Sequence, residues 1–339
     1  MDSGTMRAAV LSGHGQPLRI MDVAIPAPGP GQLLIRLEAS GVCHTDVHIW
    51  RGSVVPAAAP SPFVLGHEGV GVVAAVGPGV TDWSVGERAG AAWLHDTCGS
   101  CAECRDGEES FCQTHRAHGF NVPGTFAEYV VADARFAARL PEGDASMLAP
   151  LMCAGLTAYG ALQRAELARG ETCAIFGCGG LGLYAVELAV RAGARVIAVD
   201  SDEAKLAVAA ARGAHKTVLA TPGLAGGWDA DDRAHVCVNF APTTATWDVM
   251  LAAICPRGRI IAAAMVSQPV GLDQEWLTAS GVRITGTSVG TRAQMAELMA
   301  IHAREPLAGE ITRISLDDVT DALSALDRGT AKGRFCVMF

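Results

Sequence analysis

The sequence has no excess of positive charge. It carries 26 Lys and Arg residues against 35 Asp and Glu, giving a formal net charge of -9 at pH 7 and a pI of about 5.6. Binding to nucleic acid requires a basic face, so we expect no nucleic-acid partner. Only 18% of the residues are charged and 50% are hydrophobic, which excludes a mainly disordered chain. The composition is typical of a soluble protein that acts on small molecules.

Long hydrophobic runs and a targeting segment are missing as well. Glycine or charge interrupts every apolar stretch before it reaches the ~20 residues of a membrane span. Residues 1–5 are polar, with neither the basic nor the apolar region of a secretory leader. We therefore expect a cytoplasmic protein with no membrane contact. The 339 residues predict about two domains, at ~150 residues each.

Cysteine, in contrast, is abundant. The chain has eleven cysteines, an odd number that fits poorly with a purely disulfide framework, and clustered cysteines in a reducing compartment are more often metal ligands. Cys98, Cys101, Cys104 and Cys112 share one loop with little regular pattern, from His95 to Val122. Four thiolates suit a closed tetrahedral zinc that contributes to folding without doing chemistry. A redox Cys-x-x-Cys motif is the weaker alternative, because this loop lies outside any βαβ unit.

Hydrophobic patterning divides the chain near Pro150. Before it, short runs rich in Val, Ile and Leu alternate with Pro- and Gly-rich breaks, which predicts an antiparallel or barrel-like β domain. After it, strands alternate with helices, which predicts a parallel, doubly wound sheet. The expected strands are Arg7–Leu11, Gln32–Ala39, Gly69–Val76, Ala127–Val131, Thr172–Phe176, Arg195–Val199, Thr217–Leu219, Ala234–Val238, Arg259–Ala264 and Arg334–Phe339. The expected helices are Cys153–Arg169, Leu181–Ala192, Lys205–Arg212, Trp247–Ile254, Gln294–Ala303 and Asp318–Asp327.

A glycine-rich loop follows the strand Thr172–Phe176 and opens a helix, which is the context of a dinucleotide-binding loop. Gly177 permits a tight turn, Gly179 lets the backbone approach a pyrophosphate, and Gly182 allows close packing of helix on strand. The cofactor-binding candidates in this loop are Gly177, Gly179, Gly180, Leu181 and Gly182. A purely structural strand–turn–helix is a less favourable interpretation.

An acidic residue ends the next strand and bears on the choice of cofactor. The Asp200 carboxylate is placed to accept hydrogen bonds from ribose hydroxyls and to repel a 2′-phosphate. Residues 201–203 offer no arginine for such a phosphate, so NAD is favoured over NADP. Lys205 is a candidate contact to the adenosine ribose, although a solvated helix lysine explains it nearly as well.

A second set of metal-ligand residue types is scattered along the chain. Cys43 begins a Cys-His-Thr-Asp motif, His67 precedes the strand Gly69–Val76, and Cys153 follows at the change of pattern. Two thiolates and an imidazole leave the fourth position of a zinc ion open. Each residue alone has an ordinary explanation; Cys153 by itself would be a buried thiol.

Taken together, these motifs resemble the medium-chain zinc alcohol dehydrogenases, particularly the shorter microbial branch that includes the yeast enzyme. The resemblance covers nearly the whole chain and includes the motifs at Cys43–Asp46, Gly66–Gly77, Pro150–Cys153, Val289–Arg292 and Lys332–Arg334. It implies an α/β fold in two domains: a GroES-like, β-barrel-type catalytic domain at 1–154, completed by 289–339, and a doubly wound Rossmann domain at 155–288.

The resemblance also implies roles around the catalytic zinc. Cys43, His67 and Cys153 would be its ligands, and Asp46 would hydrogen-bond His67 and fix its tautomer. Glu68 would lie behind the metal.

Further residues receive cofactor, relay and pocket roles from the same resemblance. Thr45 would accept the proton of the substrate hydroxyl and pass it through the nicotinamide ribose to His48. The cofactor would be contacted by His44, Val289 and Arg334, with His44 and Arg334 at its pyrophosphate. Trp50 and Trp93 would narrow the substrate pocket, although both could be ordinary core aromatics. The poorest match is Ala263–Val266 beside the nicotinamide.

The implied activity is that of an NAD-dependent alcohol dehydrogenase with two zinc ions per chain, one catalytic and one structural. Zinc lowers the pKa of a bound alcohol, as it does that of water, so that an alkoxide can form and lose hydride at neutral pH. The partner is a small alcohol, aldehyde or ketone, and the resemblance suggests a homotetramer, with a homodimer as the alternative.

Three other classes of protein remain alternatives. A polyol or sugar dehydrogenase of the same superfamily commonly replaces the third zinc ligand, so Cys153, Trp50 and Trp93 argue against it. A zinc-free quinone reductase would need neither cysteine set. A non-catalytic NAD-binding protein, like a lens crystallin, would not need the intact ligands and relay.

Overall fold

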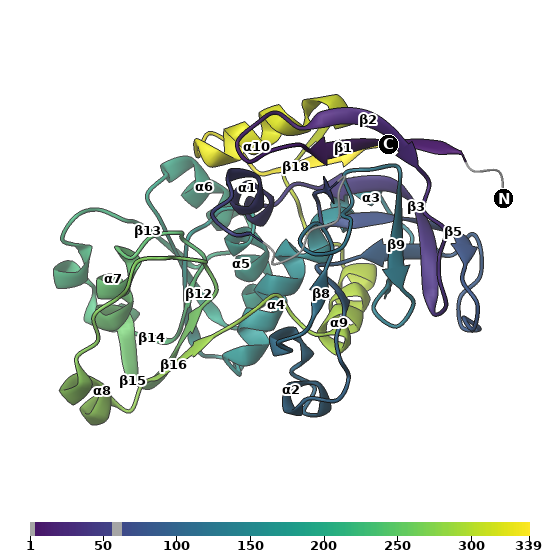
Figure 1. Ribbon diagram of the computed structural model, residues 1–339. Helices are drawn as coiled ribbons and strands as arrows, with labels where there is room; N and C mark the ends of the chain where they lie inside the picture. Colours follow the sequence, from purple (N-terminus) through teal and green to yellow (C-terminus); the bar gives the residue numbers. More distant parts are fainter. Residues whose placement is uncertain (1–3, 56–62) are drawn as a thin grey trace. The chain divides into compact units, whose positions relative to one another are not determined.

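The computed structural model describes residues 4–55 and 63–339 (Figure 1), so the polar N-terminal stretch lies partly outside the described residues. The chain divides into two compact units, Met1–Leu156 with Thr291–Phe339, and Thr157–Gly290. These boundaries lie two residues beyond the predicted ones. Among the described residues no single helix is long and apolar enough to cross a membrane; the bent pair Ala145–Met152 and Ala154–Arg164 passes by length and composition only.

The unit at 157–290 is built on a parallel sheet. Its described strands follow the order β13-β12-β11-β14-β15-β16. Because the chain winds outward from β11 in both directions, the sheet is doubly wound, as predicted. The strands are β11 (Thr172–Phe176), β12 (Arg195–Asp200), β13 (Lys216–Leu219), β14 (Ala234–Asn239), β15 (Ile254–Ala262) and β16 (Arg283–Gly286). The helices are α5 (Gly182–Arg191), α6 (Glu203–Ala211), α7 (Thr246–Ala253) and α8 (Gln274–Ser280), with short 3-10 turns η3 (Leu224–Gly227) and η4 (Ala230–Asp232).

The other unit is organised around one long strand. β3 (Gln32–Gly41) pairs antiparallel with β5, β9 and β18, so the C-terminal strand β18 lies beside a strand from the start of the chain (Figure 1). This pairing is why the last residues complete the first unit. The remaining strands are β1 (Thr5–Leu11), β2 (Arg19–Ala24), β4 (Phe63–Val64), β5 (Gly69–Val76), β6 (Arg88–Ala91), β7 (Leu94–Asp96), β8 (Arg116–Ala117), β9 (Tyr129–Asp133), β10 (Ala138–Arg139), β17 (Ile311–Ile314) and β18 (Arg334–Met338).

The helices of this unit are short, apart from α9. They are α1 (His44–Arg51), α2 (Ala102–Arg105), α3 (Ala145–Leu148), α9 (Arg292–Arg304) and α10 (Val319–Asp327), with 3-10 turns η1 (Glu109–Phe111), η2 (Ala149–Met152) and η5 (Leu316–Asp318); α4 (Ala154–Arg164) runs on into the second unit. One apolar core packs α1 and α10 against β1 and β4, and another packs β3, β5, β6 and β9 together.

Several boundaries differ from the predictions for local reasons. The helix predicted to reach Arg169 ends at Arg164, because Glu166 takes the left-handed conformation at φ 51°. Residues 126–127 bond to β1 and not to β3, so β9 begins two residues later than predicted. The strand predicted at Arg259–Ala264 begins five residues earlier, at Ile254.

Candidate functional site

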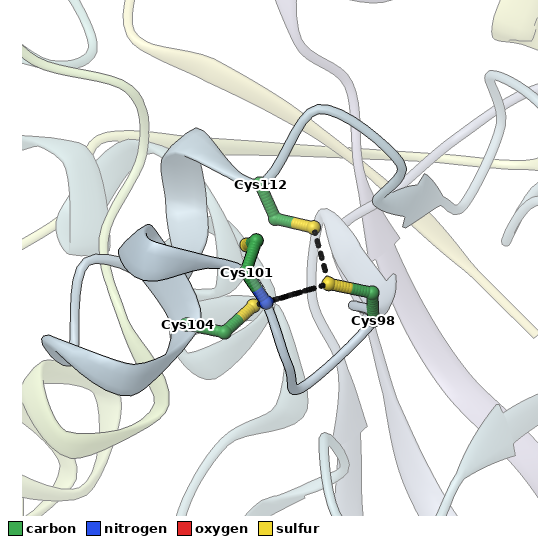
Figure 2. A group of neighbouring side chains, drawn as sticks. All are labelled: Cys98, Cys101, Cys104 and Cys112. Carbon is green, nitrogen blue, oxygen red and sulfur yellow. Dashed lines mark hydrogen bonds between the residues drawn. The ribbon is translucent and has the colours of Figure 1, made fainter.

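The four clustered cysteines gather around one point. Their sulfur atoms all lie within 4.8 Å of one another (Figure 2). The Sγ atoms of Cys98 and Cys104 are 3.9 Å apart, and those of Cys98 and Cys112 are 3.7 Å apart. A tetrahedral zinc with ~2.3 Å bonds to sulfur requires sulfurs about 3.8 Å apart. The four residues therefore fit a zinc ion, and a full protein ligand set leaves no position for a substrate.

The loop also prepares a thiolate. The backbone N–H groups of Ser100 and Cys101 donate to the Cys98 sulfur at 3.5 and 3.3 Å. These bonds, that of Ser100 first, lower the pKa of Cys98 to about 5. Because the thiolate is the form that binds metal, the Cys98 sulfur is prepared as a metal ligand near neutral pH.

The second group lies inside the same unit. Cys43, His67, Glu68 and Cys153 are buried, with one ligand atom of each within 4.8 Å of the others. The sulfurs of Cys43 and Cys153 are 4.0 Å apart, again close to the ~3.8 Å of a tetrahedral zinc. The Nε2 atom of His67 is buried and has no hydrogen-bond partner among the described residues. An unsatisfied imidazole nitrogen beside two thiols fits a metal ligand.

Asp46 holds the segments of this centre together. Its carboxylate accepts hydrogen bonds from the N–H of Cys43 at 2.9 Å, the N–H of Gly66 at 3.2 Å and Nδ1 of His67 at 3.0 Å. Cys43 precedes α1 and Asp46 lies in its first turn, so the start of the helix is capped by the same carboxylate. The bond to Nδ1 leaves Nε2 of His67 as the atom available to a metal.

The charges around Cys43 and His67 suit a bound cation. The Cys153 thiol holds the pKa of Cys43 well below its usual value. Burial lowers the pKa of His67, but Asp46 and Cys43 outweigh it, so the net pKa is raised well above the usual value. The centre thus concentrates negative charge around His67, which a divalent cation would balance.

Glu68 is bound by an arginine from the last strand. Arg334, on β18, donates to the Glu68 carboxylate, and both side chains are buried. Burial raises the pKa of Glu68 to about 7, with Arg334 opposing the shift. Gly41 leaves room for this carboxylate, because a Cβ there would overlap Glu68 Oε2. Arg334 thus contacts Glu68, and its contact with a pyrophosphate stays a prediction.

The predicted relay residues share one helix. Thr45 and His48 lie three residues apart on α1, and so on the same face. Both are partly exposed. The His48 ring lies 5.0 Å from that of His44, and its Nδ1 is 3.5 Å from the Ser53 hydroxyl. Burial, then the charge of His44, lowers the pKa of His48.

The two tryptophans assigned to the pocket lie in different surroundings. Trp93 is partly exposed, and its ring lies edge-on to His67 with centroids 5.0 Å apart. Trp50 is 4% exposed, belongs to the core around α1, and donates from Nε1 to Gln16 O at 2.6 Å. Of the two, Trp93 contacts a candidate zinc ligand, whereas Trp50 packs in the core around α1; the pocket role of each stays a prediction.

The glycine-rich loop has the backbone that a phosphate cradle needs. Gly177 has φ 90°, and a Cβ on Gly182 would overlap Gly177 O. A Cβ on Gly179 would meet no described atom within 4 Å, so this backbone is open to a ligand. The Asp200 carboxylate accepts from the N–H of Cys178 at 2.7 Å, which ties the end of β12 to the loop. The loop therefore fits a dinucleotide pyrophosphate.

The structure also shows the surroundings of other residues around the predicted cofactor site. Cys178 is fully buried, so its thiol packs against the sheet. Lys205 is half-buried on α6, and Leu181 and Gly180 lie where the loop enters α5. Val289 has φ 49°, which is unusual for a β-branched residue.

Sequence analysis gave no role to four residues near these sites, namely Glu109, Arg292, His95 and His118. Arg292 makes four hydrogen bonds of 2.6 to 3.0 Å to the buried Glu109 carboxylate, which anchors the cysteine loop to the start of α9. His95 and His118 form a buried pair. The Thr291-Arg292 motif was the one available signal for these contacts, because partners far apart along the chain leave no local pattern.

Comparisons with known proteins agree with this geometry. Residues 29–142 match the family described as the alcohol dehydrogenase GroES-like domain, and residues 180–304 match zinc-binding dehydrogenase. An alcohol dehydrogenase of Moraxella sp. strain TAE123 is 36% identical over 337 residues, with 98% of this chain and 99% of the relative covered.

Solved structures give the same result. Acetophenone reductase from Geotrichum candidum, in complex with NAD, has a TM-score of 0.88 and 31% identity, covering 100% of this chain and 98% of that one. A thermostable alcohol dehydrogenase from Pyrobaculum aerophilum has a TM-score of 0.89 and 28% identity, covering 99% of this chain and 100% of that one. With both family matches in place and the metal-ligand sets assembled, the chain belongs to the medium-chain, zinc-type alcohol dehydrogenase family.

Proposed function

We propose that the protein is an NAD-dependent alcohol dehydrogenase that interconverts an alcohol with an aldehyde or ketone. The observation that carries the proposal is the buried set of Cys43, His67 and Cys153, in which Nε2 of His67 has no hydrogen-bond partner among the residues that the structure describes. Three such ligands are typical of a catalytic zinc, which keeps one position for substrate. When bound, zinc supplies a Lewis acid that lowers the pKa of an alcohol and polarises a carbonyl, and NAD supplies the hydride acceptor.

The chain's own residues orient these groups and move the proton. Asp46 fixes the His67 tautomer through Nδ1. In our proposal the Thr45 hydroxyl, which can both accept and donate, takes the proton of the alcohol. His48 then receives it at the partly exposed end of the relay and releases it to solvent. Trp93, beside His67, forms the wall that limits substrate size.

The direct test uses the purified protein with two zinc ions per chain. Absorbance of NADH should rise when simple primary and secondary alcohols are added with NAD, and fall in the reverse reaction with the matching carbonyls. Turnover of polyols alone, or of quinones with NADPH, would replace this proposal by one of the other enzyme classes. Light scattering on the same sample would test the homotetramer that the family resemblance suggests.

The first variant prediction concerns cofactor choice. Asp200→Gly should narrow the gap in kcat/KM between NAD and NADP by at least about tenfold, chiefly by weakening NAD, because a carboxylate at the end of β12 favours a free 2′-hydroxyl. Steady-state kinetics with both cofactors measures this ratio.

Asp202 provides a matched control. Asp202→Asn removes the same charge two residues away, on an exposed side chain that caps α6. Its cofactor ratio should stay as in wild type. Equal ratios in wild type and Asp200→Gly would mean that Asp200 does not face the ribose.

The second variant prediction concerns the relay. Because the pKa of His48 is lowered from its usual 6.5, the ring stays neutral, and so able to accept a proton, as the pH falls below neutrality. His48→Gln should therefore slow alcohol oxidation most on the acidic side of neutral, where hydroxide cannot replace the lost base. We expect a loss of ~10²-fold at most there, since general bases contribute ~10²–10⁴-fold and this one is partly exposed.

The measurement is a pH profile of kcat/KM for wild type and His48→Gln. Added imidazole or another buffer base should restore part of the rate, because it substitutes for the missing ring. Superimposable profiles without rescue would remove His48 from the relay.

A further inference from the structure

Two buried histidines near the metal centre have no role in the proposed mechanism. His95, on β7, is 3% exposed, and His118, just after β8, is 1% exposed. Their rings are nearly perpendicular, with Nδ1 of His95 3.1 Å from Nε2 of His118. Neither belongs to the two metal-ligand groups found among the described residues. A buried pair of polar rings that hydrogen-bond each other, and of which one also bonds the backbone, favours one local arrangement.

His118 holds the backbone on both sides of Trp93. Its Nδ1 lies 2.7 Å from Ala92 O, closer than its Nε2 lies to Val131 O at 3.3 Å. A carbonyl can only accept and a neutral imidazole has one N–H, so Nδ1 is the donor. Its backbone N–H donates to Trp93 O at 3.0 Å. One residue therefore binds the peptide carbonyl before Trp93 and the peptide carbonyl after it, which fixes the direction of the Trp93 side chain.

The turn that carries His118 is itself fixed to a zinc-ligand segment. A Cβ on Gly119 would lie 2.5 Å from Gly66 O, and one on Gly124 would overlap the same atom, so the turn packs directly on the residue before His67. Phe120, in this turn, lies 5.7 Å from the Trp93 ring. The turn thus contacts both the His67 segment and Trp93.

These contacts fix the position of the Trp93 side chain. Its ring meets the His67 ring edge-on at 5.0 Å while part of the indole stays exposed. An indole beside the metal ligand limits the space for a bound alcohol, and its orientation sets that limit.

We propose that His118, supported by His95, is a positioning residue that orients Trp93 beside His67 and thereby sets the size preference for the alcohol. The inference rests on the proposed alcohol dehydrogenase function for its kinetic consequence, but its structural content, the orientation of Trp93, is independent of turnover.

The experiment compares His118→Phe with His118→Asn. Phenylalanine keeps the ring and loses the bond to Ala92 O, whereas the asparagine amide nitrogen lies near the position of Nδ1 and keeps it. In His118→Phe the ratio of kcat/KM for a branched secondary alcohol to that for ethanol should rise by about tenfold, which is the discrimination available from one methylene-sized change. His118→Asn should stay near the wild-type ratio.

His302→Phe is the matched control for stability. His302, on α9, is also a buried histidine of the same unit, and its Nδ1 accepts a hydrogen bond from the N–H of Leu307. The His302→Phe substitution should lower the melting temperature without changing the ratio of kcat/KM for the branched alcohol to that for ethanol. A ratio that changes in this control as much as in His118→Phe would overturn the proposal.

A double-mutant cycle makes the test specific to Trp93. Trp93→Ala should raise the ratio by itself, and His118→Phe should add nothing further in that background, because the side chain it positions is gone. An equal effect of His118→Phe with and without Trp93 would overturn the proposal. If His118→Phe does not fold, His95→Phe takes its place, and an unchanged alcohol ratio there would also overturn it.

A spectroscopic readout separates this inference from the proposed function. The near-ultraviolet circular dichroism of Trp93 is obtained by subtracting the spectrum of the Trp93→Phe protein from that of its parent. This difference spectrum should change in His118→Phe and stay the same in His302→Phe, even if the protein oxidises no alcohol. Absence of turnover would refute the proposed function alone, whereas an unchanged difference spectrum would refute the positioning role.

Discussion

Cys43→Ser should abolish alcohol oxidation in a protein that is still folded. The change replaces one of the three candidate ligands of the buried centre by a hydroxyl, a poor ligand for zinc. Altering groups that only hydrogen-bond to zinc ligands costs ~10–100-fold in affinity or activity, so losing a ligand should lower kcat/KM by more than ~100-fold. Serine is slightly smaller than cysteine, and the Asp46 carboxylate still caps α1, so the fold should persist.

Metal analysis and kinetics together check this prediction. Zinc per chain should fall from about two to about one, with a melting temperature close to that of wild type. Cys173→Ser is the matched control, because Cys173 is a fully buried thiol in the other unit, outside both metal-ligand groups found in the described residues. It should keep both zinc ions and full activity. A Cys43→Ser protein that retains two zinc ions and its activity would show that the catalytic centre lies elsewhere.

The parts of the fold that sequence predicted best are those specified by local pattern. The strand Thr172–Phe176 has the predicted bounds, because a parallel strand buried on both faces is a continuous apolar run. The edge strand Arg283–Gly286 was not predicted, since its residues are mostly exposed and show no apolar alternation. The helix His44–Arg51 was also unpredicted, although it carries the proposed relay; its cap depends on the buried Asp46.

The site depends on contacts between distant residues. Cys43 and Cys153 are separated by 110 residues and Glu68 and Arg334 by 266, so no periodicity could bring them together. Resemblance to a family supplied the ligand set, but it did not supply the bond of Arg334 to Glu68. Trp50 and Trp93 received the same role from the family resemblance. The structure places the Trp93 ring against His67, whereas Trp50, on α1, packs into the core around that helix.

Among the single variants proposed, Cys101→Ser should lower the thermal stability most. The four thiolates close the loop from Cys98 to Cys112, and in the chain-entropy treatment a closure of about 15 residues contributes about 3 kcal/mol. At 1 kcal/mol per 2–4 °C for a unit of this size, the melting temperature should fall by roughly 6–12 °C. The loop should remain partly anchored, because Glu109 keeps its four bonds to Arg292.

Activity should respond differently from stability in this variant. At a temperature well below its melting point, Cys101→Ser should retain most of its kcat/KM, because none of the four cysteines belongs to the buried centre around His67. Zinc should fall to about one ion per chain. Glu109→Gln added to Cys101→Ser should lower the melting temperature further, since it weakens the remaining anchor. Cys255→Ser, at a half-buried cysteine outside both metal groups, is the control and should change neither quantity. If Cys101→Ser lost activity at an unchanged melting temperature, the structural and catalytic roles of the two centres would have to be exchanged.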